Sequence, residues 1–161
     1  MYITNKKIVN AIELRDDDSG SYGSYFRITR KVGIKVMKFK KNGGYDLRKA
    51  LLKSGIYKEA VKEYKMIKEA RRRSKMVVKT YGLKTFKYID QWYVGILLEH
   101  ISGTSLSEKN SPDKVMDNLM GVMRKVKVFI YDHNTCNFIK QRDKGWRIID
   151  FSPDWIRVEA L

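Results

Sequence analysis

The chain has 161 residues and a formal charge of +16, with 34 Lys and Arg against 18 Asp and Glu. This length is typical of one domain, and a content of 43% apolar residues with two prolines argues against intrinsic disorder. The single cysteine, Cys136, excludes an intrachain disulfide and a zinc site of several cysteines, and it favours a reducing, cytoplasmic setting. No stretch approaches the roughly 20 apolar residues of a membrane span, so we expect no membrane association.

The first half of the chain predicts a hairpin followed by helix. Residues 25–29 alternate between apolar and polar and predict a strand, residues 30–31 a turn, and residues 32–39 a second strand. Residues 45–74 carry apolar side chains at spacings of three and four, which predicts helix. Gly55 is expected to divide this stretch into two helices.

The second half predicts shorter elements. Residues 76–81 and 92–98 are typical of strands, and Ser111-Pro112 is typical of the start of a helix. Four side chains are expected to form the apolar face of that helix: Val115, Leu119, Val122 and Met123. Three short apolar runs follow between polar loops: residues 126–131, 137–140 and 147–150. This order of elements predicts an α+β fold.

Three polar side chains towards the C-terminus have the chemistry of a cation site. Asp132 and Asn137 stand five positions apart in a polar loop, and Asp150 ends an apolar run thirteen residues later. Carboxylate and amide oxygens hold hard divalent cations, and a carboxylate can instead orient a hydroxyl nucleophile.

The N-terminal third carries features suited to phosphate. Gly20-Ser-Tyr-Gly23 precedes the first predicted strand and could bring backbone N–H groups close to an anion. Lys35 stands in an apolar stretch, where a lysine requires an anionic partner. Lys38 is an alternative, because a shift of odd length exchanges the two faces of a strand. The following helix offers three partners: Glu59, Glu63 and Glu69.

In this order and spacing, these segments resemble the protein-kinase-like fold. Residues 20–25 resemble the second half of its Gly-rich loop, with Asp18 in place of the first glycine. Val32-Gly-Ile-Lys35 is similar to the V-A-I-K strand. Residues 63–67, which begin with Glu63, are similar to the third helix of the family, and residues 76–82 are similar to the strand that follows that helix.

The resemblance extends through most of the remaining chain. Residues 93–106 resemble the hinge between lobes, where the adenine binds in this family. Residues 130–137 resemble the H-R-D-x-x-x-x-N catalytic loop, and residues 148–152 resemble the D-F-G segment. In total the similarity covers about residues 16–153.

What the resemblance implies about the site can be stated residue by residue. The catalytic residues would be Asp132, Lys35 and Glu63, with Glu63 holding Lys35. The ATP-binding residues would be Gly20, Ser21, Tyr22, Gly23, Lys35, Glu99 and Ile101. The Mg²⁺ ligands would be Asn137 and Asp150. Lys38 stays an alternative to Lys35, and Glu59 an alternative to Glu63.

The chain also departs from the family pattern. Ile130 and Tyr131 replace the His and Arg before the catalytic Asp, and Ser152 replaces the last Gly of D-F-G. Eleven residues follow Asp150, and they include neither the A-P-E segment nor the further helices that bind the peptide substrate in this family. We therefore expect a nucleotide-binding lobe over residues 1–98 and a hinge with a reduced second lobe over residues 99–161, as in small bacterial or phage kinase-like proteins.

The expected function is an ATP- and Mg²⁺-dependent phosphotransferase whose acceptor is a protein Ser or Thr hydroxyl. The alternatives are a catalytically weak, pseudokinase-like binding module and a kinase for a small molecule or saccharide. The charge of +16 suits an acidic or phosphate-bearing protein partner. Nucleic acid is a further class of anionic partner, although no nucleic-acid-binding motif accompanies the charge.

Overall fold

A computed structural model of the chain describes residues 3–14, 23–108, 112–150, 154 and 156–160, and it has an α+β fold with antiparallel sheets. The chain divides into two compact units. The first contains residues 1–64 and 80–100, and the second contains residues 65–79 and 101–161. Among the described residues, no helix is long and apolar enough to span a membrane.

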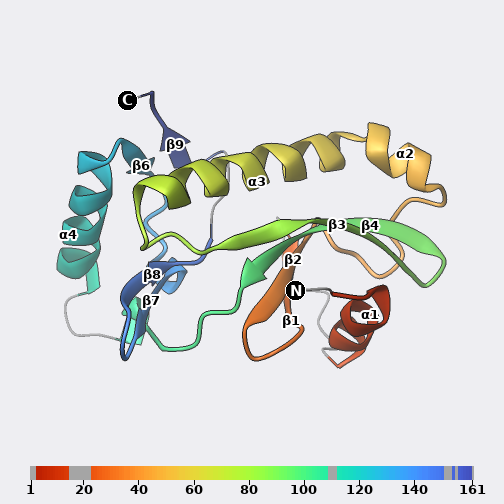
Figure 1. Ribbon diagram of the computed structural model, residues 1–161, viewed down its shortest axis with the longest axis horizontal. Coiled ribbons are helices and arrows are strands. Elements are labelled where there is room, and N and C mark those ends of the chain that lie inside the picture. The colour runs from red at the N-terminus through yellow and green to blue at the C-terminus, as the bar shows by residue number, and fades with distance from the viewer. Residues whose placement is uncertain (1–2, 15–22, 109–111, 151–153, 155, 161) are drawn as a thin grey trace. The chain divides into compact units, whose positions relative to one another are not determined.

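The first unit is built on a four-stranded sheet of order β1-β2-β4-β3, in which neighbouring strands run antiparallel (Figure 1). Its elements are α1 (Asn5–Glu13), β1 (Gly23–Arg27), β2 (Val32–Met37), α2 (Arg48–Lys53), the first half of α3 (Gly55–Arg73), β3 (Thr80–Tyr88) and β4 (Gln91–Glu99).

Strand β2 is buried at every position because the sheet is covered on both faces. Successive side chains of a strand point to opposite faces. Val32, Ile34 and Val36 join the apolar cluster that includes Ile8 and Ile12 of α1. In Figure 1, α1 lies on one side of this sheet and α2 with the start of α3 on the other. Lys35 is therefore placed on the face that α3 covers.

The second unit has shorter elements. They are the second half of α3, β5 (Thr104–Ser105), a 3₁₀ turn (Leu106–Glu108), α4 (Pro112–Lys125), β6 (Val128–Ile130), a second 3₁₀ turn (Thr135–Asn137), β7 (Phe138–Gln141), β8 (Gly145–Ile148) and β9 (Ile156–Val158). One sheet has the order β5-β7-β8, and β6 pairs with β9. Helix α4 packs on β6 and on both 3₁₀ turns.

Several predicted elements are confirmed and others are wrong. Helix α3 begins at Gly55, as expected, and α4 begins at Pro112. Helix α1 and strand β9 are absent from the prediction. The strand predicted over residues 76–81 is wrong over most of its length, because β3 runs from Thr80 to Tyr88 and overlaps it at residues 80–81.

The predicted apolar face of α4 is confirmed in part: Met123 is buried and Val115 and Leu119 are half-buried, but Val122 is exposed. The buried residues of α4 are Met116, Met120 and Met123, whereas the side chain of Val122 is 48% exposed. The methionines recur at spacings of four and three, so they form a stripe of their own on the helix. The packing of α4 on β6 therefore selects a face about one residue away from the predicted one.

The turn between β3 and β4 provides a test of backbone strain. Ile89 and Asp90 both have positive φ, 43° and 61°, as a two-residue type I′ hairpin requires. A β-branched residue is unfavourable there, whereas Asn adopts this conformation readily. We expect Ile89→Asn to stabilise the fold by about 1 kcal/mol and to raise the melting temperature by roughly 3 °C. Ile89→Val, which keeps the branched Cβ, should give no gain, and a lower melting temperature for Ile89→Asn would contradict the assignment of strain.

Candidate functional site

A buried ion pair joins β2 to α3 within the first unit. The Nζ of Lys35 donates to Oε1 of Glu63 across 3.0 Å, and the two side chains are 11% and 2% exposed. Strand β2 lies between β1 and β4, so Lys35 cannot reach solvent as a lysine at a sheet edge would. A charge this deeply buried is tolerated when an opposite charge neutralises it.

A second lysine–glutamate pair lies close in sequence but differs in burial. Lys38 and Glu59 are 3.1 Å apart, and their side chains are 45% and 49% exposed. Lys38 comes after the end of β2 and has a φ of 44°, so it does not continue the alternation of the strand. The structure thus separates the alternatives: Lys35 pairs with Glu63 inside the fold, and Lys38 pairs with Glu59 at the surface.

An aromatic contact lies on the same sheet face as Lys35. Tyr25 of β1 is the cross-strand neighbour of Lys35, and its hydroxyl lies 3.0 Å from Nδ1 of His100. The two rings are nearly parallel, with an interplanar angle of 18° and centroids 6.0 Å apart. The sequence did not reveal this contact, because the two residues are 75 positions apart and each is ordinary by itself.

The protonation states of the two rings fit this hydrogen bond. Burial raises the pKa of Tyr25 to about 12, and the charge of Arg27 offsets part of that rise. Burial, together with the charge of Arg27, lowers the pKa of His100. Near pH 7 the phenol therefore keeps its proton and the imidazole is neutral, so the Tyr25 hydroxyl can donate to Nδ1 of His100.

The ring of Tyr25 packs directly against Gly33, so position 33 has no space for a side chain. A Cβ built on Gly33 would overlap the hydroxyl and ring carbons of Tyr25. We expect Gly33→Ala to destabilise the protein by roughly 2 kcal/mol in urea unfolding, through overpacking. Adding Tyr25→Ala should recover part of that loss, with a coupling energy of about 1 kcal/mol or more. Additive effects of the two substitutions would show that they do not share this space.

The second unit brings Asp132, Asn137 and the segment leading to Asp150 together. Oδ2 of Asp132 accepts from Nδ2 of Asn137 at 2.7 Å, and Oδ1 accepts from the N–H of Asn134 at 2.9 Å. The N–H of Ile149 donates to the carbonyl of Asn137 at 3.0 Å, so the residue before Asp150 is fixed to the same loop. These bonds hold the loop carboxylate and turn the side-chain oxygen of Asn137 away from Asp132.

This arrangement limits how a cation could bind. Within the described part of the chain, no three or more His, Cys, Asp or Glu side chains cluster closely enough to hold a metal ion. Asn137 and Asp150 would supply two oxygen ligands, one from an amide and one from a carboxylate. Such a set fits Mg²⁺, which commonly takes few protein ligands and completes its shell with water and phosphate oxygens.

The remaining predicted residues have mixed outcomes. Gly20, Ser21 and Tyr22 lie outside the described residues. Gly23 is the first residue of β1, Glu99 is the last residue of β4, and Ile101 follows it, half-buried. The structure therefore describes the pair of Lys35 with Glu63 and the loop of Asp132 in detail, each in its own unit.

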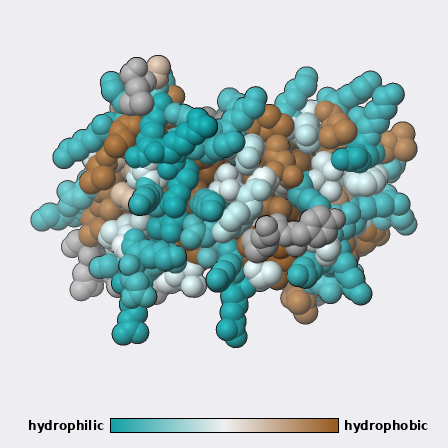
Figure 2. All heavy atoms as spheres, viewed as in Figure 1, coloured by the Kyte–Doolittle hydropathy of each residue, from teal (hydrophilic) through white to brown (hydrophobic). Residues whose placement is uncertain are grey.

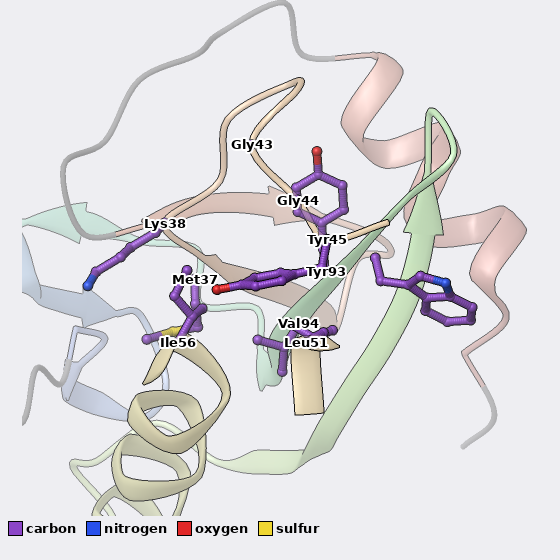
Figure 3. A pocket seen from close by; sticks show the side chains of 10 residues that line it. Met37, Lys38, Gly43, Gly44, Tyr45, Leu51, Ile56, Tyr93 and Val94 are labelled. Atoms are coloured by element: carbon purple, nitrogen blue, oxygen red, sulfur yellow. The ribbon is translucent and has the colours of Figure 1, made fainter. Parts of the chain in front are cut away.

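A separate hollow in the first unit does not have the properties of a ligand site (Figure 3). Half of its lining residues are Met37, Leu51, Ile56, Tyr93 and Val94. It has room for about one water molecule. Among its lining residues Lys38 alone carries a charge, and that charge already pairs with Glu59.

Comparison with known proteins gives no relative, since neither a protein-family model nor a curated protein matches this chain.

Proposed function

We propose that the protein is an ATP- and Mg²⁺-dependent phosphotransferase with a protein-kinase-like fold. The observation that carries the proposal is the buried ion pair of Lys35 and Glu63. Burying a lysine in an inner strand is costly, and a structural role alone would be served as well by two apolar side chains. A fixed ammonium group next to a glutamate is, in contrast, what binding of nucleotide phosphates uses.

The loop of Asp132 and Asn137 in the second unit supports the proposal, because it carries the groups that would act on the acceptor hydroxyl and on the cation. Asp132 is held by two hydrogen bonds and stands in a loop with Asn137, whose backbone is bonded to the residue before Asp150. Phosphoryl transfer depends on positioning and on neutralising charge rather than on covalent steps by the protein. A rigid carboxylate beside two oxygen ligands suits that requirement.

Each residue has one role in the proposed reaction. Lys35 would bind the α- and β-phosphates, and Glu63 would position Lys35. Asp132 would orient the acceptor hydroxyl and accept its proton as the oxygen attacks the γ-phosphate and ADP leaves. Asn137 and Asp150 would hold Mg²⁺, which supplies neutralisation of phosphate charge when it is bound. The acceptor we propose is a Ser or Thr hydroxyl of a protein.

Incubation with γ-labelled ATP and Mg²⁺, alone and with a cell lysate, tests this function. We expect label to pass to protein with the wild type and to fall by about 100-fold or more with Asp132→Ala. Equal signals from the two proteins would contradict the proposal. Stabilisation by ATP without any transfer would instead support a binding module of the pseudokinase kind.

A further inference from the structure

A cluster of cations lies in the second unit where the end of α3 meets the turn after α4. We call it the basic corner, and it consists of Arg72, Arg73, Arg124, Lys125 and Lys127. Nη1 of Arg73 donates to the backbone carbonyl of Lys127 at 3.3 Å, which joins the two segments although they are 54 positions apart. Positive side chains from both helices are thereby gathered in one region.

The corner has more positive than negative charge. Glu69 pairs with Arg72 at 3.3 Å and with Arg73 at 3.2 Å. Arg124, Lys125 and Lys127 are exposed, and none of them has an ion pair with a described residue. Glu159, whose N–H donates to the carbonyl of Lys127, pairs with Arg157 at 3.5 Å and adds no net charge. The five cations of the corner and the carboxylate of Glu69 therefore leave a surplus of four positive charges.

The fold accounts for part of this charge but not for Lys127. Cations in the last turn of a helix interact favourably with its dipole, which explains Arg124 and Lys125 at the end of α4. Lys127 lies beyond the helix with a φ of 60°, a left-handed conformation in which glycine is the preferred residue just after a helix. A lysine at this position is less favourable for the backbone than a glycine. In return it adds an exposed ammonium group to the basic corner.

The surface chemistry of the corner favours one class of partner. Protein interfaces depend on large apolar or aromatic anchors, with Trp, Tyr and Arg dominant. On the described parts of α3 and α4, Val122 is the one large apolar side chain that is exposed, and valine is rare among such anchors. Figure 2 shows that hydrophilic side chains cover most of the visible face. Clustered Lys and Arg with no exposed aromatic side chain on the described residues of the same two helices are instead typical of contacts with phosphate backbones.

We propose that the basic corner binds the phosphodiester backbone of nucleic acid independently of base sequence. This inference does not rest on the proposed phosphotransferase, because it uses none of the residues assigned to that reaction. Each ionic contact with a phosphate releases counterions, so the binding constant should fall steeply as the salt concentration rises. In a plot of the logarithm of the binding constant against the logarithm of the salt concentration, each phosphate contacted on duplex DNA should contribute a slope of about −0.9.

The test uses a fluorescent duplex of about 20 base pairs, as DNA and as RNA, and measures anisotropy from about 50 to about 200 mM salt. The corner variant is Arg72→Gln, Arg124→Gln, Lys125→Gln and Lys127→Gly. We expect the wild type to bind at least one duplex, and the corner variant to bind it at least 10-fold more weakly, with a slope smaller by about 3. A matched control removes four exposed cations from the first unit through Lys6→Gln, Lys7→Gln, Arg30→Gln and Lys31→Gln. It should lose less than about 3-fold in affinity.

The single substitution Lys127→Gly separates binding from folding. We expect it to weaken duplex binding while leaving the melting temperature unchanged or up to about 3 °C higher, because glycine relieves the left-handed backbone. Equal losses in the corner and control variants would overturn the proposal, since charge alone would then explain binding. Absence of binding to both duplexes would also overturn it, as would corner-dependent binding of polyglutamate alone, which would indicate an acidic protein partner.

Discussion

Glu63→Gln is expected to destabilise the protein by about 3 kcal/mol, because it removes the carboxylate charge that lies 3.0 Å from the buried ammonium group of Lys35. The surface pair offers a matched control on the same helix. Glu59→Gln removes the carboxylate from a pair that is about half exposed, and it should cost less than about 1 kcal/mol. Urea unfolding of both variants measures the difference, and similar losses would contradict the buried placement of Lys35 and Glu63.

A double substitution then separates stability from function. Replacing both members of the buried pair with apolar residues, as in Lys35→Met with Glu63→Leu, should restore most of the stability lost in Glu63→Gln. The same protein should bind ATP at least 10-fold more weakly, because it lacks the ammonium group that we propose binds the phosphates. Wild-type affinity for ATP in a folded double variant would show that the pair serves only to hold β2 against α3.

Asp150→Asn is expected to lower the rate of phosphoryl transfer by about 1000-fold, equivalent to about 4 kcal/mol, while the fold is kept. The amide of asparagine has nearly the same shape as the carboxylate but no charge. The variant should therefore hold Mg²⁺ less tightly, and the phosphate charge would be neutralised less well. Initial rates across a Mg²⁺ titration measure this effect, and the variant should need more Mg²⁺ for half of its maximal rate.

Asp143→Asn provides the control for that experiment. Asp143 is exposed in the turn between β7 and β8, a few residues before Asp150, and carries the same formal charge. Its substitution should change the rate by less than about 2-fold, since an exposed carboxylate with no role in the proposed reaction contributes little. If both variants were equally impaired, or neither were, Asp150 would not be a ligand of the cation.

The sequence predicts a lysine–glutamate pair between the second strand and the following helix. It does not decide between Lys35 and Lys38, or between Glu63 and Glu59. Lys35 and Lys38 differ by three positions, so they lie on opposite faces of any regular strand. The choice depended on where β2 ends and on which face α3 covers, and both are set by packing between segments far apart in the chain. Residues that pair locally, such as Glu69 with Arg72 and Arg73, lie on one helix and follow from spacing alone.

The elements that were missed share a physical reason. Helix α1 is short and buries only Ile8, Ala11 and Ile12, so its pattern is weak without the sheet against which it packs. In strand β3, Phe86, Lys87 and Tyr88 alternate as in a half-buried strand, but the register with β4 shifts between Thr80 and Gly82, which interrupts the alternation near the start of the strand. In α4, methionine and valine–leucine stripes compete at helical spacing, and only the tertiary contact with β6 decides between them.

Transfer of the terminal phosphate of ATP to a hydroxyl can be distinguished from other reactions of ATP by the use of two labels. The wild-type protein is incubated with Mg²⁺ and with ATP labelled either at the γ- or at the α-phosphate, and covalent label on protein is counted. We expect labelling from γ-labelled ATP alone, dependent on Mg²⁺ and on Asp132. Labelling from α-labelled ATP would indicate nucleotide transfer and would exclude the proposed phosphotransferase, and so would no labelling from either.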